Sequence, residues 1–259
     1  MIKFAKIIFG ICIGFFVCTN TLLAQERTLL IVVGSENAYK PFAYLDVENQ
    51  PTGFDNDVMK AVVSYIPNAQ LQIISVPWNV IFTGLDSKKF HIIANQITKN
   101  SEREERYIFS SQPYFYGVSG LILGKDSTIA DIKELTNAKI GVTVGSNHAT
   151  NLEKYVSENP QQNIKIVYYK TSPALVTDLA NGRVEAMIND PISALDYAKS
   201  QNIQLTITSF HFEKNPVYLV FRKDSQELAD MVNIALEKAI KDGKISALSI
   251  KYFGIDQTK

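Results

Sequence analysis

The sequence predicts an α/β protein built as two lobes that are joined by two hinge strands. Two observations lead to this prediction. First, apolar runs of strand length alternate with segments of helical period, which is typical of parallel sheets covered by helices. Second, the pattern starts again after Gly120, so the strands are too many and too evenly divided for one small sheet with a single core.

The first half of the chain supplies three expected strands and two expected helices. The strands cover residues 29–33, 71–76 and 91–95, and the helices cover residues 55–65 and 78–85. In the helix at residues 55–65 the apolar side chains fall on one face, as expected for a helix that covers a sheet: Val58, Met59, Val62 and Val63.

The second half repeats the alternation. Strands are expected at residues 139–144, 164–169 and 184–188, and helices at residues 149–156, 173–181 and 192–200. After Ser225 a helical stretch carries an apolar stripe that is expected to close the first lobe: Leu228, Met231, Val232, Ala235 and Leu236.

The expected lobes share the chain unequally. The extended segments 118–123 and 217–221 are the candidates for the two crossings, with hinges near residues 113–117 and 214–218. The first lobe then consists of residues 25–112 and 219–259, and the second lobe of residues 118–213. Ligands of open α/β folds bind at the carboxyl ends of strands, so the expected site is the cleft between the lobes.

Residues 1–24 are predicted to be a signal peptide. Lys3 and Lys6 give a basic start, residues 7–17 are apolar, and Ala24 is a small residue at the expected cut site. The apolar run is shorter than the roughly twenty residues that a membrane-spanning helix needs. A lipid anchor at Cys18 is the alternative, although Val17 is larger than the residue that usually precedes a lipidated cysteine.

Composition restricts the chemistry of the mature chain. Both cysteines lie in the predicted leader, which excludes disulfides and thiolate chemistry from the rest. Removing Lys3 and Lys6 from 26 basic residues leaves 24 against 26 acidic ones, a net charge near −2 that argues against a nucleic-acid partner. The three histidines lack a metal-ligand spacing and no nucleophile or phosphate-loop motif is present, so we expect no enzyme, no metal and no cofactor.

Three local features suit a zwitterionic ligand. Gly145-Ser146-Asn147 stands at a helix start, where backbone N–H groups favour an anion. Arg103 can grip a carboxylate with two hydrogen bonds. Asp190 follows a strand and can pair with an ammonium group. Each feature also has a structural alternative: Ser146 and Asp190 as helix caps, and Arg103 on a solvated helix.

Five motifs, taken in chain order, resemble the polar amino-acid-binding proteins of ABC importers, known as family 3 solute-binding proteins. The resemblance covers essentially the whole mature chain and implies the two-lobed, type II periplasmic binding protein fold. The motifs are Tyr39-Lys40-Pro41-Phe42, Gly53-Phe54-Asp55-Asn56-Asp57, Val76-Pro77-Trp78, the run from Thr98 through Arg103 to Pro113-Tyr114, and Lys251-Tyr252-Phe253-Gly254.

The resemblance implies a role for each charged candidate. Arg103 would clamp the α-carboxylate of the ligand, helped by Thr98 and by the helix start at Ser146 and Asn147. Asp190 would accept the α-ammonium group.

The resemblance also implies the remaining contacts. Tyr39 and Phe54 would sandwich the ligand side chain, and four polar residues would line the cleft: Glu36, Asn95, Gln96 and Thr143. A ligand gripped from both lobes would stabilise the closed state.

The implied function is the periplasmic substrate-binding component of an ABC importer, a monomer that meets an inner-membrane permease. Asn95-Gln96-Ile97-Thr98 looks like the cystine-binding branch, so L-cystine is the first expected ligand. Glutamine or a basic amino acid is the next expected ligand. A basic one is considered because Glu36 could pair with a cationic side chain.

One alternative function remains open at this point, and a second is disfavoured. The fold also resembles periplasmic cyclohexadienyl or arogenate dehydratases, for which Glu36 would be the general acid. Arg103 and Asp190 favour an intact amino-acid ligand instead. A receptor sensor domain would need a further segment after Gly254.

Overall fold

The computed structural model describes residues 28–212 and 214–259. The predicted signal peptide, with its cut site and Cys18, lies outside the described residues. No helix within the described ranges is long and apolar enough to span a bilayer.

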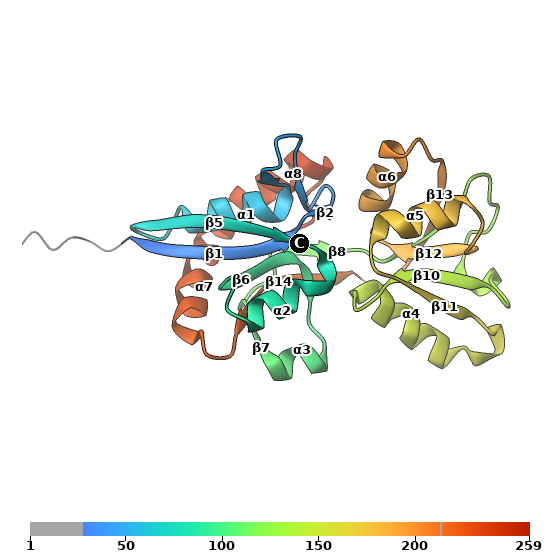
Figure 1. Ribbon diagram of the computed structural model, residues 1–259, viewed down its shortest axis with the longest axis horizontal. Coiled ribbons are helices and arrows are strands. Elements are labelled where there is room, and N and C mark those ends of the chain that lie inside the picture. The colour runs from blue at the N-terminus through green and yellow to red at the C-terminus, as the bar shows by residue number, and fades with distance from the viewer. Residues whose placement is uncertain (1–27, 213) are drawn as a thin grey trace, which may run out of the picture.

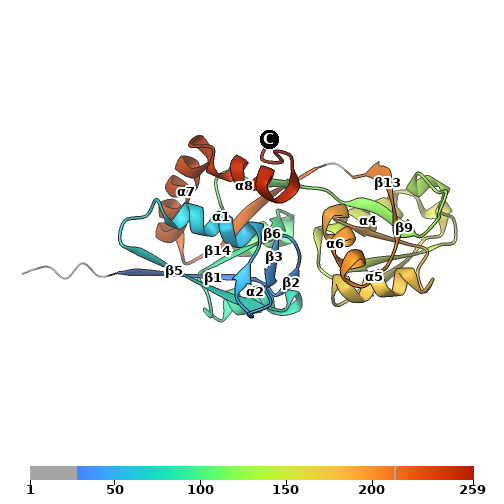
Figure 2. The same cartoon turned by 90° about the horizontal axis from the view of Figure 1, so that it is seen from above.

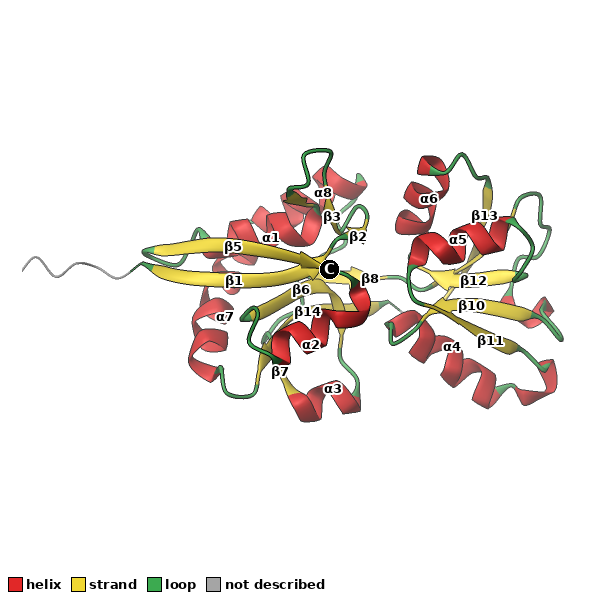
Figure 3. Ribbon diagram, viewed as in Figure 1, coloured by secondary structure: helices red, strands yellow, loops and turns green. Residues whose placement is uncertain are grey.

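The first lobe is built on a six-stranded sheet (Figures 1 and 3). Its strand order is β5-β1-β6-β14-β7, and β8 also pairs with β14. β1 runs parallel to β5 and β6, whereas β14 runs antiparallel to its neighbours. The strands are β1 (Leu29–Glu36), β5 (Ala69–Val76), β6 (Ile92–Thr98), β7 (Tyr107–Phe109), β8 (Phe115–Gly117) and β14 (Asn215–Arg222).

Helices cover both faces of this sheet. One face packs against α1 (Phe54–Val63), α7 (Gln226–Lys241) and α8 (Lys244–Phe253), which lie together in Figure 2. The other face packs against α2 (Ile81–Asp86), which follows a 3₁₀ turn at Trp78–Val80; α3 (Ser101–Arg106) precedes β7. A small separate sheet joins β2 (Ala38–Tyr39), β3 (Ala43–Leu45) and β4 (Pro51–Thr52).

The second lobe has a five-stranded sheet in the order β11-β10-β12-β9-β13. Its strands are β9 (Gly120–Gly124), β10 (Lys139–Thr143), β11 (Lys165–Tyr169), β12 (Ala186–Asn189) and β13 (Leu205–His211). Its α-helices are α4 (Asn147–Glu158), α5 (Ser172–Ala180) and α6 (Pro191–Ser200), with 3₁₀ turns at Ile132–Glu134 and Pro160–Gln162. The predicted α/β class is confirmed, and all the expected helices and strands form with shifts of a few residues at their ends.

Two sequence expectations need correction. The sheets are mixed rather than parallel, because β14 enters the first sheet antiparallel to its neighbours and β9 enters the second sheet antiparallel to both β12 and β13. The extended segments 118–123 and 217–221 are also mostly not free crossings. Backbone pairing draws them into the sheets as β9 and β14, and the chain passes between lobes just before Gly120 and again between His211 and Asn215.

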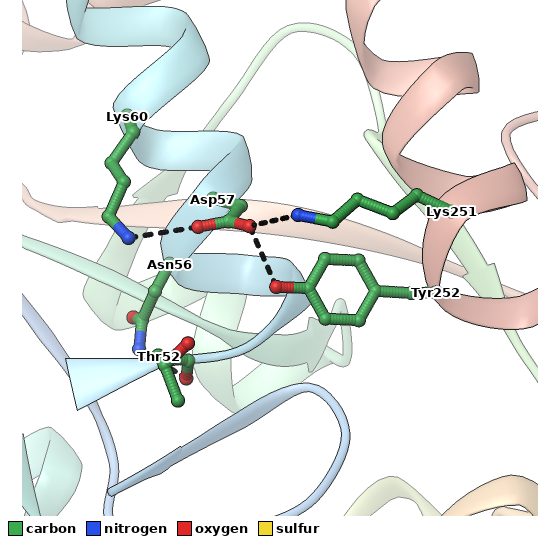
Figure 4. A network of polar contacts seen from close by, with 6 residues as sticks. All are labelled: Thr52, Asn56, Asp57, Lys60, Lys251 and Tyr252. Atoms are coloured by element: carbon green, nitrogen blue, oxygen red, sulfur yellow. Dashed lines mark hydrogen bonds and ion pairs between the residues drawn. The ribbon is translucent and has the colours of Figure 1, made fainter. Parts of the chain in front are cut away.

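Two motifs from opposite ends of the chain meet in the first lobe (Figure 4). The Asp57 carboxylate at the start of α1 accepts hydrogen bonds from Lys60 Nζ at 2.9 Å, from Tyr252 Oη at 2.7 Å and from Lys251 Nζ at 3.2 Å. Beside this network Asn56 Nδ2 donates to the Thr52 carbonyl at 2.7 Å. The contacts fix α8 against α1, so both motifs have a structural reason to be present.

Candidate functional site

A pocket lies between the lobes and draws its walls from both. The first lobe contributes Glu36, Tyr39, Trp78, Asn95 and Gln96. The second lobe contributes Thr143, Ser146, Asn147, His148 and Ser172. Seven of these were expected from the sequence: Glu36, Tyr39, Asn95, Gln96, Thr143, Ser146 and Asn147.

Glu36 and Asn95 form a paired unit where two neighbouring strands approach the pocket. Asn95 Oδ1 accepts the backbone N–H of Glu36 at 2.6 Å, and Asn95 Nδ2 donates to Glu36 Oε2 at 3.3 Å. Burial raises the pKa of the Glu36 carboxyl to about 7, with a smaller raising effect from Asp55 and a lowering one from the Asn95 hydrogen bond. The group can therefore change its charge near neutral pH.

Gln96 is held by a second buried acid. Its Nε2 donates to Asp55 Oδ1 at 2.7 Å, and Tyr114 Oη donates to the same oxygen at 3.0 Å. Burial raises the pKa of Asp55 to about 7 against these hydrogen bonds. The backbone φ of Gln96, which lies within β6, is +52°, an uncommon value for a residue with a side chain.

The second lobe presents helix starts to the pocket. Ser146 caps α4, since its Oγ accepts the Ala149 N–H at 3.1 Å while donating to the Thr143 carbonyl at 2.6 Å. The Thr143 hydroxyl lies 3.1 Å from that of Ser172, at the start of α5. The first N–H groups of a helix have no partner within it, so this side of the pocket favours an anionic group.

Arg103 joins the two lobes but does not line this pocket. Its side chain lies over the Phe82 ring, 5.1 Å from the centroid, and donates to the Thr98 carbonyl at 2.9 Å and to the Gly145 carbonyl at 2.8 Å. Burial lowers its pKa to about 10, so the guanidinium stays charged at neutral pH. Thr98 likewise stands outside the pocket lining and contributes its carbonyl.

α3 places Arg103 through a cap. Asn100 Oδ1 accepts the Arg103 N–H at 2.8 Å and so caps α3, which places Arg103 in the first turn of the helix. Asn100 is therefore the N-cap residue of α3.

Asp190 is a helix cap. Its Oδ1 accepts the N–H groups of Ile192 at 2.8 Å and Ser193 at 3.4 Å at the start of α6. Burial raises its pKa to about 6, opposed by hydrogen bonds from Ile192, Ser193 and Val118. Over the described ranges no lysine, arginine or histidine forms an ion pair with it.

Phe54 does not stand in the pocket wall. It is fully buried in an aromatic cluster, with ring centroids 5.0–6.2 Å from those of Tyr114, Phe115, Tyr252 and Phe253. The aromatic residues that line the pocket are Tyr39 and Trp78.

His148 and Ser172 line the pocket without having been singled out as site residues. Both belong to the first turn of a helix that follows a strand: His148 comes directly after Ser146-Asn147, and Ser172 precedes Pro173. This position was the signal that sequence reasoning could have used, because it had already selected Ser146 for the same reason.

Direct contacts hold the lobes together around the pocket. Trp78 Nε1 donates to the Val144 carbonyl at 2.9 Å, and the Tyr197 hydroxyl donates to the Ala38 carbonyl. The Arg103–Gly145 hydrogen bond is a third contact of this kind between the lobes. Among the described residues no cluster of acidic, histidine and cysteine side chains could hold a metal ion.

Comparison with known proteins places these features in a family. The sequence profile of the bacterial extracellular solute-binding proteins, family 3, matches residues 31–255. The L-cystine-binding protein TcyJ of Escherichia coli (strain K12) is 31% identical over 236 residues, covering 91% of this chain and 86% of that protein. The L-cystine-binding protein TcyA of Bacillus subtilis (strain 168) is 32% identical over 232 residues, covering 89% and 83%.

Solved structures give the same result. A putative L-cystine ABC transporter protein from Listeria monocytogenes superposes with a TM-score of 0.78 at 26% identity, covering 89% of this chain and 98% of that one. An ancestral arginine-binding protein bound to arginine gives a TM-score of 0.77 at 27% identity, covering 88% and 99%.

Proposed function

The chain belongs to the bacterial extracellular solute-binding proteins of family 3, and from this we propose that it captures L-cystine outside the cytoplasmic membrane and delivers it to an ABC permease. That it is the amino-acid-binding component of an ABC importer, and not an enzyme such as a dehydratase, follows from the family and its relatives. The ligand, the periplasmic location reached through a signal peptide at residues 1–24, and a monomeric state are parts of the proposal.

The observation that carries the amino-acid assignment is the position of Arg103. A buried, charged guanidinium reaches from the first lobe to the loop before α4 in the second lobe. A ligand carboxylate placed there would meet Arg103 and the N-terminus of α4 together. Exchanging the Gly145 carbonyl for the carboxylate would give the arginine a charged partner.

Asp190 is the proposed partner of the α-ammonium group. Its carboxylate is buried and has no cationic partner among the described side chains, so a ligand ammonium would supply the missing charge. Thr98 contributes to the carboxylate end through its position next to Arg103.

L-cystine is favoured by a second polar pole inside the pocket. Tyr39 and Trp78 would flank the disulfide, and Glu36 with Asn95 would meet the ammonium group of the second half of the ligand. Gln96 and Thr143 line the space between the two poles. Several relatives are cystine-binding proteins, which agrees with this choice.

A basic amino acid is the second candidate. The Glu36 carboxylate would then pair with the guanidinium or ammonium at the end of the ligand side chain. One solved relative is bound to arginine, which keeps this alternative open.

A binding panel tests the proposal. The chain from Gln25 onward is unfolded, refolded to remove bound ligand, and melted with each common amino acid, with L-cystine, and with cysteine under reducing conditions. A ligand at 100 times its Kd adds about 2.7 kcal/mol to the free energy of unfolding, which raises Tm by about 5–10 °C. A shift with cystine but not with cysteine supports the proposal. A shift with arginine or lysine alone favours the second candidate, and no shift with any of them overturns both.

A further inference from the structure

His148 has no role in the function proposed so far, although it lines the pocket. The residue lies in the first turn of α4 and only 5% of its surface is exposed. Its ring is held between lobes: Nδ1 lies 2.8 Å from the hydroxyl of Ser119, beside the crossing, and Nε2 lies 3.5 Å from the hydroxyl of Tyr39 in the first lobe.

Ser119 determines which ring nitrogen carries the proton. Its hydroxyl oxygen accepts Asn151 Nδ2 at 3.0 Å and Asn147 Nδ2 at 3.5 Å, which uses both lone pairs. The single hydroxyl proton is then directed at His148 Nδ1, which must act as an acceptor. A neutral imidazole with an unprotonated Nδ1 carries its proton on Nε2.

Burial keeps this ring neutral. It lowers the pKa of His148 to about 4, well below the pH of ordinary growth media. The group on the Nε2 side is the Tyr39 hydroxyl, and burial raises the pKa of Tyr39 well above its ordinary value. At 3.5 Å the hydrogen bond between Nε2 and the Tyr39 hydroxyl is at the outer limit of length, so the Nε2–H remains available to a better acceptor.

We propose that His148 is a specificity-determining residue, which donates its Nε2–H to an acceptor oxygen at the end of the ligand side chain. This rests on the proposed function. In L-cystine that acceptor is the carboxylate of the second half, whose ammonium group meets Glu36. The neutral His148 would then donate to the carboxylate of this half of the ligand, and the acidic Glu36 would meet its ammonium group. Ser119 is the positioning residue, because it holds the ring in the donating tautomer.

The test compares two ligands that differ at the acceptor. L-cystine has the second carboxylate, and the mixed disulfide of cysteine with cysteamine lacks it while keeping the second ammonium group. His148→Phe should weaken cystine binding by about tenfold and the mixed disulfide by less than about twofold. His148→Gln, which keeps a side-chain N–H donor, should retain most of the affinity for cystine.

Nitrogen-15 NMR of the imidazole provides a second measurement, the tautomer of the His148 ring. A purely structural role of His148 would not link this tautomer to the choice of ligand. The unsubstituted protein should show His148 protonated on Nε2, and Ser119→Ala should increase the share protonated on Nδ1 and reduce the preference for cystine over the mixed disulfide. Equal losses for both ligands in His148→Phe, or a ring protonated on Nδ1 in the unsubstituted protein, would overturn the proposal.

The outcome for His148 is separable from the choice of ligand. If the unsubstituted protein binds glutamine but neither disulfide, the cystine proposal falls. The same variants then decide the His148 proposal with glutamine against norvaline, which lacks the side-chain acceptor. A loss confined to glutamine supports it, and equal losses overturn it.

Discussion

The first lobe brings a carboxyl, a phenol, an indole and two amide groups to the pocket, mostly from strands, whereas the second lobe brings hydroxyl, amide and imidazole groups, mostly from helix starts. Burial raises the pKa of Glu36 and of Asp55 in the first lobe to about 7, so charge there depends on pH. In the second lobe Ser146 lines the pocket and caps α4, and Asp190, which does not line the pocket, caps α6. Substitutions in the first lobe are therefore expected to change how the site recognises ligand charge. Substitutions at the helix starts of the second lobe are expected to change ligand recognition and helix stability together.

The largest expected effect comes from breaking the charged bridge between the lobes. Arg103→Ala should weaken ligand binding about 1,000-fold, or ~4 kcal/mol, because a buried ligand carboxylate would lose its charged partner. Titration calorimetry measures the loss. Arg106→Ala is the matched control on the same short helix, since its side chain is half exposed and pairs with Asp86. Unchanged affinity in Arg103→Ala would remove this residue from the site.

The second prediction concerns Glu36, the carboxyl group that the first lobe contributes to the pocket. The pKa of Glu36 is about 7 in the folded protein and 4.5 ordinarily, so the folded state holds a proton that the unfolded state releases between these values. The free energy of unfolding therefore falls as pH rises from 4.5 to 7, by up to about 3 kcal/mol from this group. Glu36→Gln should raise Tm at pH 8 and leave it nearly unchanged at pH 4.5.

Thermal melts of the ligand-free protein across pH 4–8 check the Glu36 prediction. Glu105→Gln is the control, because Glu105 is exposed. Identical slopes for the Glu36 variant and the unsubstituted protein would mean that the carboxyl is not buried as described.

Asp190 allows recognition and capping to be separated within the second lobe. Asp190→Asn keeps a side-chain oxygen for the cap but loses the charge, so ligand affinity should fall about 30-fold, ~2 kcal/mol, whereas Tm should rise at pH 8 because the buried carboxylate, whose pKa burial raises to about 6, is no longer present. Asp190→Ala should lose the affinity and also about 1 kcal/mol of capping, so its Tm should lie about 2–4 °C below that of Asp190→Asn. If Asp190→Asn bound as tightly as the unsubstituted protein, the residue would be a cap and no more.

The smallest effect concerns the contact between α1 and α8. Tyr252→Phe removes the hydrogen bond to Asp57 and should lower Tm by about 2–4 °C, for ~1 kcal/mol, without changing ligand affinity. Tyr168→Phe in the second lobe removes a bond to Glu153 at an exposed position and should change Tm less. Altered ligand affinity in Tyr252→Phe would show that this network reaches the pocket.

The sequence was most informative where one strand leads into one helix. The alternation located β10 and α4, and with them Thr143 and Ser146, because strand ends and helix starts fall at one edge of a sheet. It did not show that β9 and β14 run antiparallel to their neighbours, since apolar runs carry no sign of direction.

Contacts distant in sequence explain the other differences. Phe54 was expected beside the ligand, but its surroundings include Tyr252 and Phe253, which lie almost 200 residues further along the chain. His148 was treated as one of three histidines without metal spacing, and its meaning depends on Ser119, 29 residues away. The local sequence around Phe54 or His148 does not contain these distant contact partners.

The place of β14 in the first sheet has a consequence for the order of folding. This strand lies between β6 and β7, yet it is made after the whole second lobe, whose sheet comes from one continuous stretch. The first lobe therefore cannot complete its sheet until nearly the entire chain is available, and long-range pairings of this kind form slowly.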